Sequence, residues 1–103
     1  MPHALSGKVV IAGIGHTAFG KHPGRSTVSL NIEAIRNALA DAGVEKGQVD
    51  GLFVKAPTSR FEMMYAQKLA EAMALVPLFV GVCDHGGAST NSMIAHAAMA
   101  IDA

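Results

Sequence analysis

Residues 76–101 read VPLFVGVCDHGGASTNSMIAHAAMAI, and this stretch decides the fold class. It opens with a short apolar run containing β-branched residues, which is typical of a strand buried on both faces. Asp84–Gly87 follows with the composition of a tight turn. The remaining residues are small and apolar over a length that suits a helix. We therefore predict a strand over 76–83 and a helix over 88–102.

The same strand-then-helix order occurs twice upstream. An apolar run predicts a strand over 8–14, and apolar residues at helical spacing predict a helix over 27–42. Ser26, Thr27 and Ser29 are its candidate N-caps, and Gly43 stands at the C-cap. A second strand is expected over 51–55 and a second helix over 60–75. Such alternation indicates an α/β fold with a parallel sheet and right-handed crossovers.

This β-α-β-α-β-α unit is expected to be incomplete. Three strands make a thin sheet with open edges, and half of the 103 residues are apolar, which is high for a body of this size. The third predicted helix is rich in small residues, as a buried central helix requires, and it shows no stop signal. We expect residues 1–103 to be a portion of a longer domain.

The charges exclude two classes of partner. Eight basic residues balance eight acidic ones and no block forms, so neither nucleic acid nor an anionic membrane is an expected partner. A single cysteine cannot form an internal disulfide. The longest apolar run, residues 72–83, contains Pro77 and is too short to span a membrane. No signal peptide is recognised at the start of the chain. We expect a cytoplasmic location.

Residues 13–18, GIGHTA, fit a relaxed dinucleotide-binding fingerprint. That chemistry needs a helix to begin at once, so that its N-terminus meets the pyrophosphate. Here the predicted helix begins only near Thr27, and the acidic residue expected after the second strand is missing. The glycines more simply allow the first strand to turn, and we expect no permanently bound cofactor.

The turn at Cys83–Ser89 is the main candidate site. Gly86 and Gly87 could bring the backbone close to a bound group, and Ser89 stands where the helix N-terminus offers N–H groups and partial positive charge. We predict these three residues to bind substrate through an oxyanion or a thioester carbonyl. The equally open interpretation is a tight strand–helix connection in which Ser89 caps the helix.

Cys83 and His85 are the candidate catalytic pair, since thiolate chemistry needs a nearby proton acceptor. The competing interpretation is that Cys83 is a small core residue. A metal site made by Cys83, His85 and His96 has less support, because no paired-ligand spacing recurs, and no metal is predicted.

Four segments together resemble the start of thiolase-superfamily proteins. They read VIAGIGHTAFGK at 10–21, PGRS at 23–26, ALADAG at 38–43 and VDG at 49–51. The most similar group is the sterol-carrier or lipid-transfer type, often labelled acetyl-CoA acetyltransferase. The resemblance implies the first part of a thiolase-like N-terminal domain, with the third helix buried between sheet layers. It also implies a homodimer, a coenzyme A thioester as substrate and a role in lipid metabolism.

The resemblance breaks at the nucleophile. That family places a cysteine at the start of the third helix, where this chain has Gly87, and Cys83 stands four residues too early. Relatives with a Gly-Gly-Ala-Ser turn act as aldolases with a small partner protein. We therefore expect an acyl-CoA carbon–carbon bond enzyme without the usual cysteine, running aldol, retro-aldol or unusual acyl-transfer chemistry. The alternatives are a conventional thiolase that uses Cys83 and a non-catalytic acyl-CoA or lipid-binding subunit.

Overall fold

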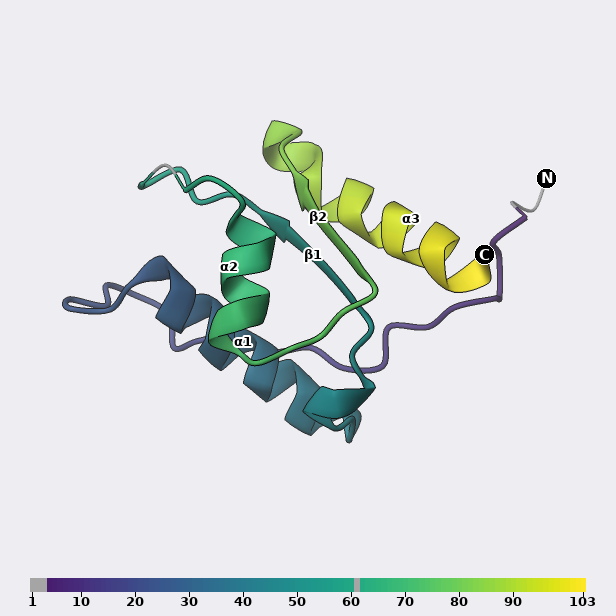
Figure 1. Ribbon diagram of the computed structural model, residues 1–103, viewed down its shortest axis with the longest axis horizontal. Coiled ribbons are helices and arrows are strands. Elements are labelled where there is room, and N and C mark those ends of the chain that lie inside the picture. Colours follow the sequence, from purple (N-terminus) through teal and green to yellow (C-terminus); the bar gives the residue numbers. More distant parts are fainter. Residues whose placement is uncertain (1–3, 61) are drawn as a thin grey trace.

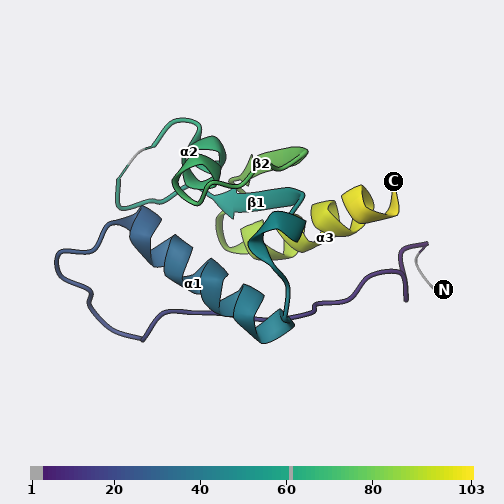
Figure 2. The same cartoon turned by 60° about the horizontal axis from the view of Figure 1, so that its bottom comes forward.

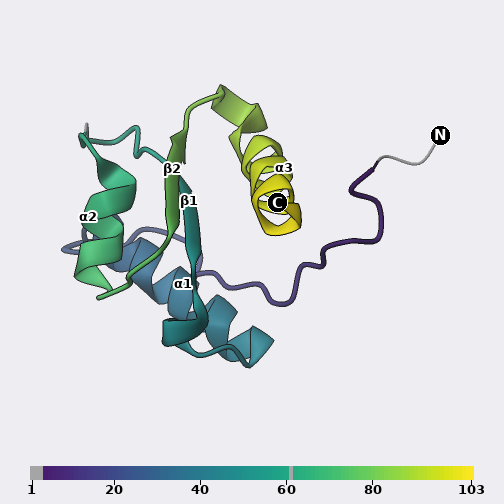
Figure 3. The same cartoon turned by 45° about the vertical axis from the view of Figure 1, so that its right-hand side comes forward.

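The computed structural model describes residues 4–60 and 62–103, and it has an α/β fold. Two parallel strands lie between helices, with α2 and α1 on one face of the sheet and α3 on the other (Figures 1 and 3). In chain order the elements are α1 (Thr27–Ala42), the 3₁₀ turn η1 (Lys46–Gln48), β1 (Gly51–Lys55), α2 (Tyr65–Ala72), β2 (Phe79–Cys83), the 3₁₀ turn η2 (Gly86–Ala88) and α3 (Ser89–Asp102).

The core lies between the sheet and α2. β1 and β2 pair in register from Gly51 opposite Phe79 to Lys55 opposite Cys83. Because side chains alternate along a strand, Leu52 and Val54 both point to the α2 side, where they are buried. There they meet Tyr65 and Leu69 of α2, and α1 packs Val28, Ile32 and Ile35 against the same cluster.

Helix α1 begins and ends where the sequence predicts. The Oγ of Ser26 accepts a hydrogen bond from the N–H of Ser29 at 3.1 Å, which is an N-cap. Gly43 has a φ of 68°, and the N–H groups of Gly43 and Val44 donate to the last carbonyls of the helix. These bonds form a left-handed C-cap, and the prediction of a helix over 27–42 is confirmed.

The strand predicted over 8–14 is wrong. Residues 9–18 follow an extended path along α1 without pairing to the sheet, visible as the purple-to-blue trace below the sheet in Figure 2. Val10 is 85% exposed and Ile14 is 72% exposed, so their apolar side chains are not the buried face of a strand. The described sheet therefore has two strands instead of three.

Two glycines explain where this segment lies. A Cβ on Gly13 would stand 2.7 Å from the Ala38 carbonyl oxygen, and a Cβ on Gly15 would collide with the backbone of Ala34 and Ala38. The extended chain thus lies directly on the small-residue side of α1. The N–H of Ile14 donates to Oδ2 of Asp41 at 2.9 Å, a helix side chain rather than a neighbouring strand.

Helix α2 is shorter than the predicted 60–75. Met64 precedes it with a φ of 54° and Ala74 follows it with a φ of 55°. A left-handed residue cannot continue a right-handed helix, so these two positions bound the helix at Tyr65–Ala72. Phe61, within the predicted helix, lies outside the described residues.

Glu62, just before α2, has a pKa below its usual value because Lys68 donates a hydrogen bond to its carboxylate at 2.8 Å. A lowered folded-state pKa adds stability above the unfolded-state pKa, and that stability is lost as the pH falls through the folded-state pKa. Lys68 is half exposed and the pair is open to solvent screening, so this effect is small.

The strand predicted over 76–83 begins later, at Phe79. Pro77 has no N–H to donate, and the N–H groups of Leu78 and Phe79 both donate to the Asp50 carbonyl just before β1. Ladder pairing therefore starts only after the proline. The predicted strand over 51–55 is confirmed as β1.

Helix α3 begins at Ser89, one residue after the predicted start, because Gly86–Ala88 forms a 3₁₀ turn. The expected burial of this helix by further protein stays a prediction. Only Ser89 and Ala98 are buried, whereas Ile94, Met99 and Ile101 are exposed. The reason is that α3 packs on one face of the sheet and no described element covers its outer side. Among the described helices, none has the length and apolar character to cross a membrane.

Candidate functional site

The candidate site is the turn that leaves the carboxyl end of β2 and starts α3. Gly86 has a φ of 60°, a left-handed conformation that favours glycine. A Cβ added to Gly86 or Gly87 would meet nothing within 4 Å, so the backbone there faces open space. The first N–H groups of a helix have no intrahelical acceptor. The N–H groups of Ala88 and Ser89 donate within the turn, so the N–H groups of Gly86 and Gly87 are its candidate donors.

Ser89 holds this turn together from within. It is 2% exposed, and its Oγ accepts a hydrogen bond from the His85 N–H at 2.9 Å while donating to the Gly86 carbonyl at 2.8 Å. The Ser89 N–H also donates to the Gly86 carbonyl. The geometry thus shows the tight strand–helix connection, but Ser89 does not cap the helix as the alternative expected, because Ala88 is the N-cap residue and no side chain caps α3. Substrate binding by Ser89, Gly86 and Gly87 stays a prediction.

The two predicted catalytic residues, Cys83 and His85, differ in their exposure to solvent. Cys83 is the last residue of β2 and is 8% exposed, on the face of the sheet opposite the Leu52–Val54 core. The His85 side chain lies two residues further along, in an exposed position on the turn. Within residues 4–60 and 62–103, no hydrogen bond joins the thiol to the imidazole. The catalytic role of this pair stays a prediction.

A charged pair that the sequence analysis missed flanks the turn. The Nζ of Lys55, at the end of β1, lies 3.8 Å from Oδ1 of Asp84, the first residue after β2. Adjacent parallel strands bring their carboxyl ends to the same edge of a sheet, so the spacing could have been predicted from the two strands. The pair is partly exposed and contributes little stability, but it places a cation beside the turn.

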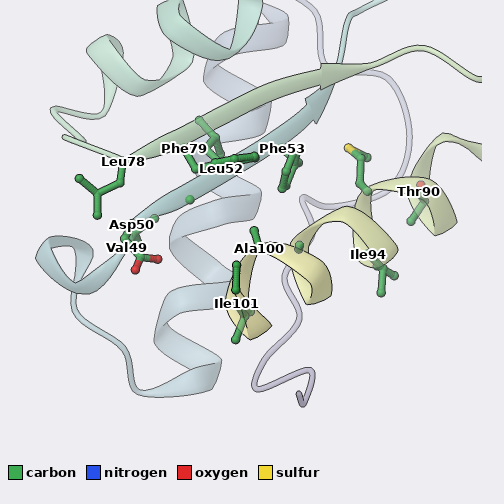
Figure 4. A pocket seen from close by; sticks show the side chains of 14 residues that line it. Val49, Asp50, Leu52, Phe53, Leu78, Phe79, Thr90, Ile94, Ala100 and Ile101 are labelled. Atoms are coloured by element: carbon green, nitrogen blue, oxygen red, sulfur yellow. The ribbon is translucent and has the colours of Figure 1, made fainter. Parts of the chain in front are cut away.

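A pocket of ≈820 Å³ lies elsewhere, between the sheet and α3 (Figure 4). Its walls are mostly apolar, with Leu52, Phe53, Phe79, Ile94 and Ile101 among them. Cys83, His85 and the turn glycines are absent from its lining, and Thr90 is the nearest contributor in sequence. Chemistry-bearing groups gather at the turn, so we place the candidate site there rather than in the pocket.

The third possible metal ligand, His96, is engaged elsewhere. Its Nδ1 lies 2.8 Å from the Ser92 carbonyl, one turn earlier in α3, and its ring lies 6.1 Å from that of Phe53. In the described part of the chain, no group of three or more His, Cys, Asp or Glu side chains could hold a metal ion.

Comparison with known proteins gives three informative similarities, although no family model matches. Over 97 residues, or 94% of this chain, the sequence is 38% identical to 17-hydroxy-3-oxo-4-pregnene-20-carboxyl-CoA lyase of Mycobacterium tuberculosis. It is 37% identical over the same length to a steroid side-chain-cleaving aldolase of Thermomonospora curvata. The chain spans 24% of the length of each of these relatives.

The fold is similar to a solved structure as well. The Ltp2-ChsH2(DUF35) aldolase matches with a TM-score of 0.74 and 38% identity, over 89% of this chain and 23% of that one. The sequence matches leave at most six of the 103 residues outside them, because 103 − 97 = 6, so the Cys83–Ser89 turn lies inside the matched span.

These comparisons correct the predicted assignment. The prediction of a thiolase-superfamily protein of the acetyl-CoA acetyltransferase type is wrong, because the matching proteins are named as a lyase and aldolases. The description as an acyltransferase or transferase falls with it, and so does the alternative of a conventional thiolase that uses Cys83. The prediction of aldol or retro-aldol chemistry without the cysteine agrees with the names of these relatives.

Proposed function

We propose that this chain is a segment of a carbon–carbon lyase that performs retro-aldol cleavage on the side chain of a coenzyme A thioester, with a steroid-type acyl group as substrate. The observation that carries the proposal is 38% identity over 94% of the chain to a carboxyl-CoA lyase. The solved aldolase with a TM-score of 0.74 supports it independently at the level of the fold.

Retro-aldol cleavage needs a hydroxyl group on the carbon β to the thioester carbonyl. A base takes the hydroxyl proton, a carbonyl forms at that carbon, and the bond between the α and β carbons breaks. The bonding electrons move to the α carbon as a thioester enolate, which then accepts a proton. The products are a ketone or aldehyde and a shorter acyl-CoA. No thiol nucleophile takes part.

The described turn suits one half of this chemistry. Negative charge develops on the thioester oxygen as the enolate forms, and preorganised N–H donors stabilise such charge. Gly86 and Gly87 present backbone at an exposed helix start, where a partial positive charge also gathers. We assign these N–H groups to the thioester oxygen. His85, with its exposed side chain, stays the candidate base on this segment.

We further propose that the full polypeptide works with an accessory protein. The matched solved structure carries two protein names, Ltp2 and ChsH2(DUF35). The apolar face of α3, with Ile94, Met99 and Ile101 exposed, is a surface for further protein to cover, either the rest of the full polypeptide or this partner. A second copy of the chain, as the resemblance implied, is a further partner to test by light scattering.

The cysteine-free mechanism is tested by Cys83→Ala. We expect the full polypeptide, expressed with its partner, to keep at least about half of its turnover of a β-hydroxyacyl-CoA, because the thiol is buried and the chemistry needs none. The lost side-chain contacts cost about 1 kcal/mol of stability. The measurement is release of the shorter acyl-CoA, followed by mass spectrometry.

Two results would contradict this proposal. An acyl adduct on Cys83, or a loss of turnover of about a hundredfold in the folded variant, would show that the thiol acts as a nucleophile. If the wild-type protein and its partner cleave no β-hydroxyacyl-CoA yet still bind one, the chain belongs to a non-catalytic acyl-CoA-binding subunit.

A further inference from the structure

We infer that Ser89 is a positioning residue for the proposed reaction: its buried hydroxyl fixes the backbone donors of the turn and does not itself contact the substrate. The inference rests on the proposed function for its kinetic consequence. Its structural part, the hold of one hydroxyl on two turn residues, stands on the hydrogen bonds alone.

The Ser89 side chain is buried. Ser89 is 2% exposed, and it is the one buried polar residue among the described residues. A hydroxyl taken out of water needs hydrogen bonds to offset its desolvation. Ser89 has both, one accepted from the His85 N–H and one donated to the Gly86 carbonyl. The one hydroxyl proton is used within the turn and the side chain is 2% exposed, so the hydroxyl has little capacity left for a ligand.

The two hydrogen bonds of the Ser89 hydroxyl hold the turn against the start of α3. They attach the residues on either side of the His85–Gly86 peptide bond to the first residue of α3. Gly86 is in the left-handed region, which an unsupported glycine leaves readily. With the carbonyl of Gly86 fixed by Ser89, the next peptide plane is fixed too, and that plane carries the N–H of Gly87. The Ser89 hydroxyl, together with the Ser89 N–H that donates to the same carbonyl, thus sets the direction of the exposed donors.

The direction of these donors affects the rate of the proposed reaction. Donors that meet charge only in the transition state raise kcat rather than substrate affinity. Displacing such groups by about 1 Å can cost about a hundredfold in rate. Loss of the Ser89 hydroxyl should therefore lower kcat and leave KM nearly unchanged. A residue that only stabilised the fold would lower the amount of active protein without this split.

The test compares Ser89→Ala, Ser89→Thr and Ser92→Ala in the full polypeptide with its partner. Ser92 is the matched control, since it lies one turn further along α3 and its Oγ lies 3.4 Å from Nδ1 of His96, away from the turn. We expect Ser89→Ala to lower kcat about tenfold or more, with KM within about threefold and the fraction of folded protein unchanged. Ser92→Ala should stay within about twofold of wild type in both constants.

Ser89→Thr separates positioning from stability. It keeps the hydroxyl but adds a methyl group at a fully packed position, so it should melt lower than Ser89→Ala while turning over faster. The reverse ranking, in which activity follows melting temperature, would overturn the inference. An unchanged kcat in folded Ser89→Ala would overturn it as well.

Amide hydrogen exchange of His85 makes the structural part independent of the proposed function. The His85 N–H should be protected in wild type and in Ser92→Ala, and should exchange at least tenfold faster in Ser89→Ala. If the amide exchange differs as expected while neither the wild type nor any variant cleaves a β-hydroxyacyl-CoA, the proposed lyase function is wrong. The role of the Ser89 hydroxyl in fixing the turn is then still supported. Equal exchange in Ser89→Ala and wild type would overturn the structural part.

Discussion

Gly15→Ala is expected to release residues 9–18 from α1 and to destabilise the folded chain by about 3 kcal/mol or more, at or above the upper end of overpacking costs. The added methyl group would collide with backbone atoms of Ala34 and Ala38. Backbone inside a helix cannot rotate away as a side chain can, so the extended segment has to move. Urea unfolding followed by circular dichroism measures the loss.

A local readout accompanies the Gly15 prediction. The Ile14 N–H donates to Asp41 in the folded chain, and its amide exchange should accelerate when the segment separates from the helix. Gly47→Ala is the matched control, because a Cβ there meets nothing within 4 Å. If Gly15→Ala unfolds at the same urea concentration as Gly47→Ala, the close contact between this segment and α1 does not exist in solution.

Leu69→Ala is expected to destabilise the fold by about 2–5 kcal/mol. Leu69 is fully buried where α2 meets the sheet, in the same cluster as Tyr65, Leu52 and Val54. Shortening its isobutyl side chain to a methyl group loses transfer free energy and leaves a cavity that the short helix cannot fill. Small domains have a total stability of about 5–15 kcal/mol, so this one change consumes much of it. The midpoint of urea unfolding gives the value.

Gln67→Ala controls for the effect of mutation in α2 itself. Gln67 is exposed on the same helix, so its replacement should change stability by less than about 0.5 kcal/mol. A Leu69→Ala variant as stable as Gln67→Ala would mean that α2 does not pack on the sheet as described.

Local signals carried most of the fold prediction. Helix α1 has its left-handed C-cap at Gly43, which could be recognised in the sequence, and its N-cap at Ser26, which was one of three candidates there. β1 was predicted to the residue for a related reason, as an apolar run between turn residues. The failures came where tertiary contact decided the outcome. A β-branched run at 9–14 gives no indication that two glycines will hold it on a helix instead of in a sheet.

In the candidate site, too, local features were predicted from the sequence and tertiary contacts were not. The glycine turn was visible in the sequence because Gly86 and Gly87 stand between a strand and a helix. That Ser89 is buried and bonded on both sides could not be predicted, since its burial depends on how α3 returns over the sheet. The Lys55–Asp84 pair was missed although it could have been predicted, because both residues stand at the carboxyl ends of the two predicted neighbouring strands. Gly87 stands where the thiolase family has its nucleophilic cysteine, and this difference favoured an aldolase over a thiolase.

Helix α2 has a consequence for the order of folding. It is eight residues long and stands between two left-handed residues that are not glycine. Isolated helices of that length are scarcely populated in water, so α2 should form only when β1 and β2 are ready to receive it. α1, twice as long and capped at both ends, can form first on its own. We expect substitutions in α1 to change the folding rate, and substitutions in α2 to change chiefly the unfolding rate.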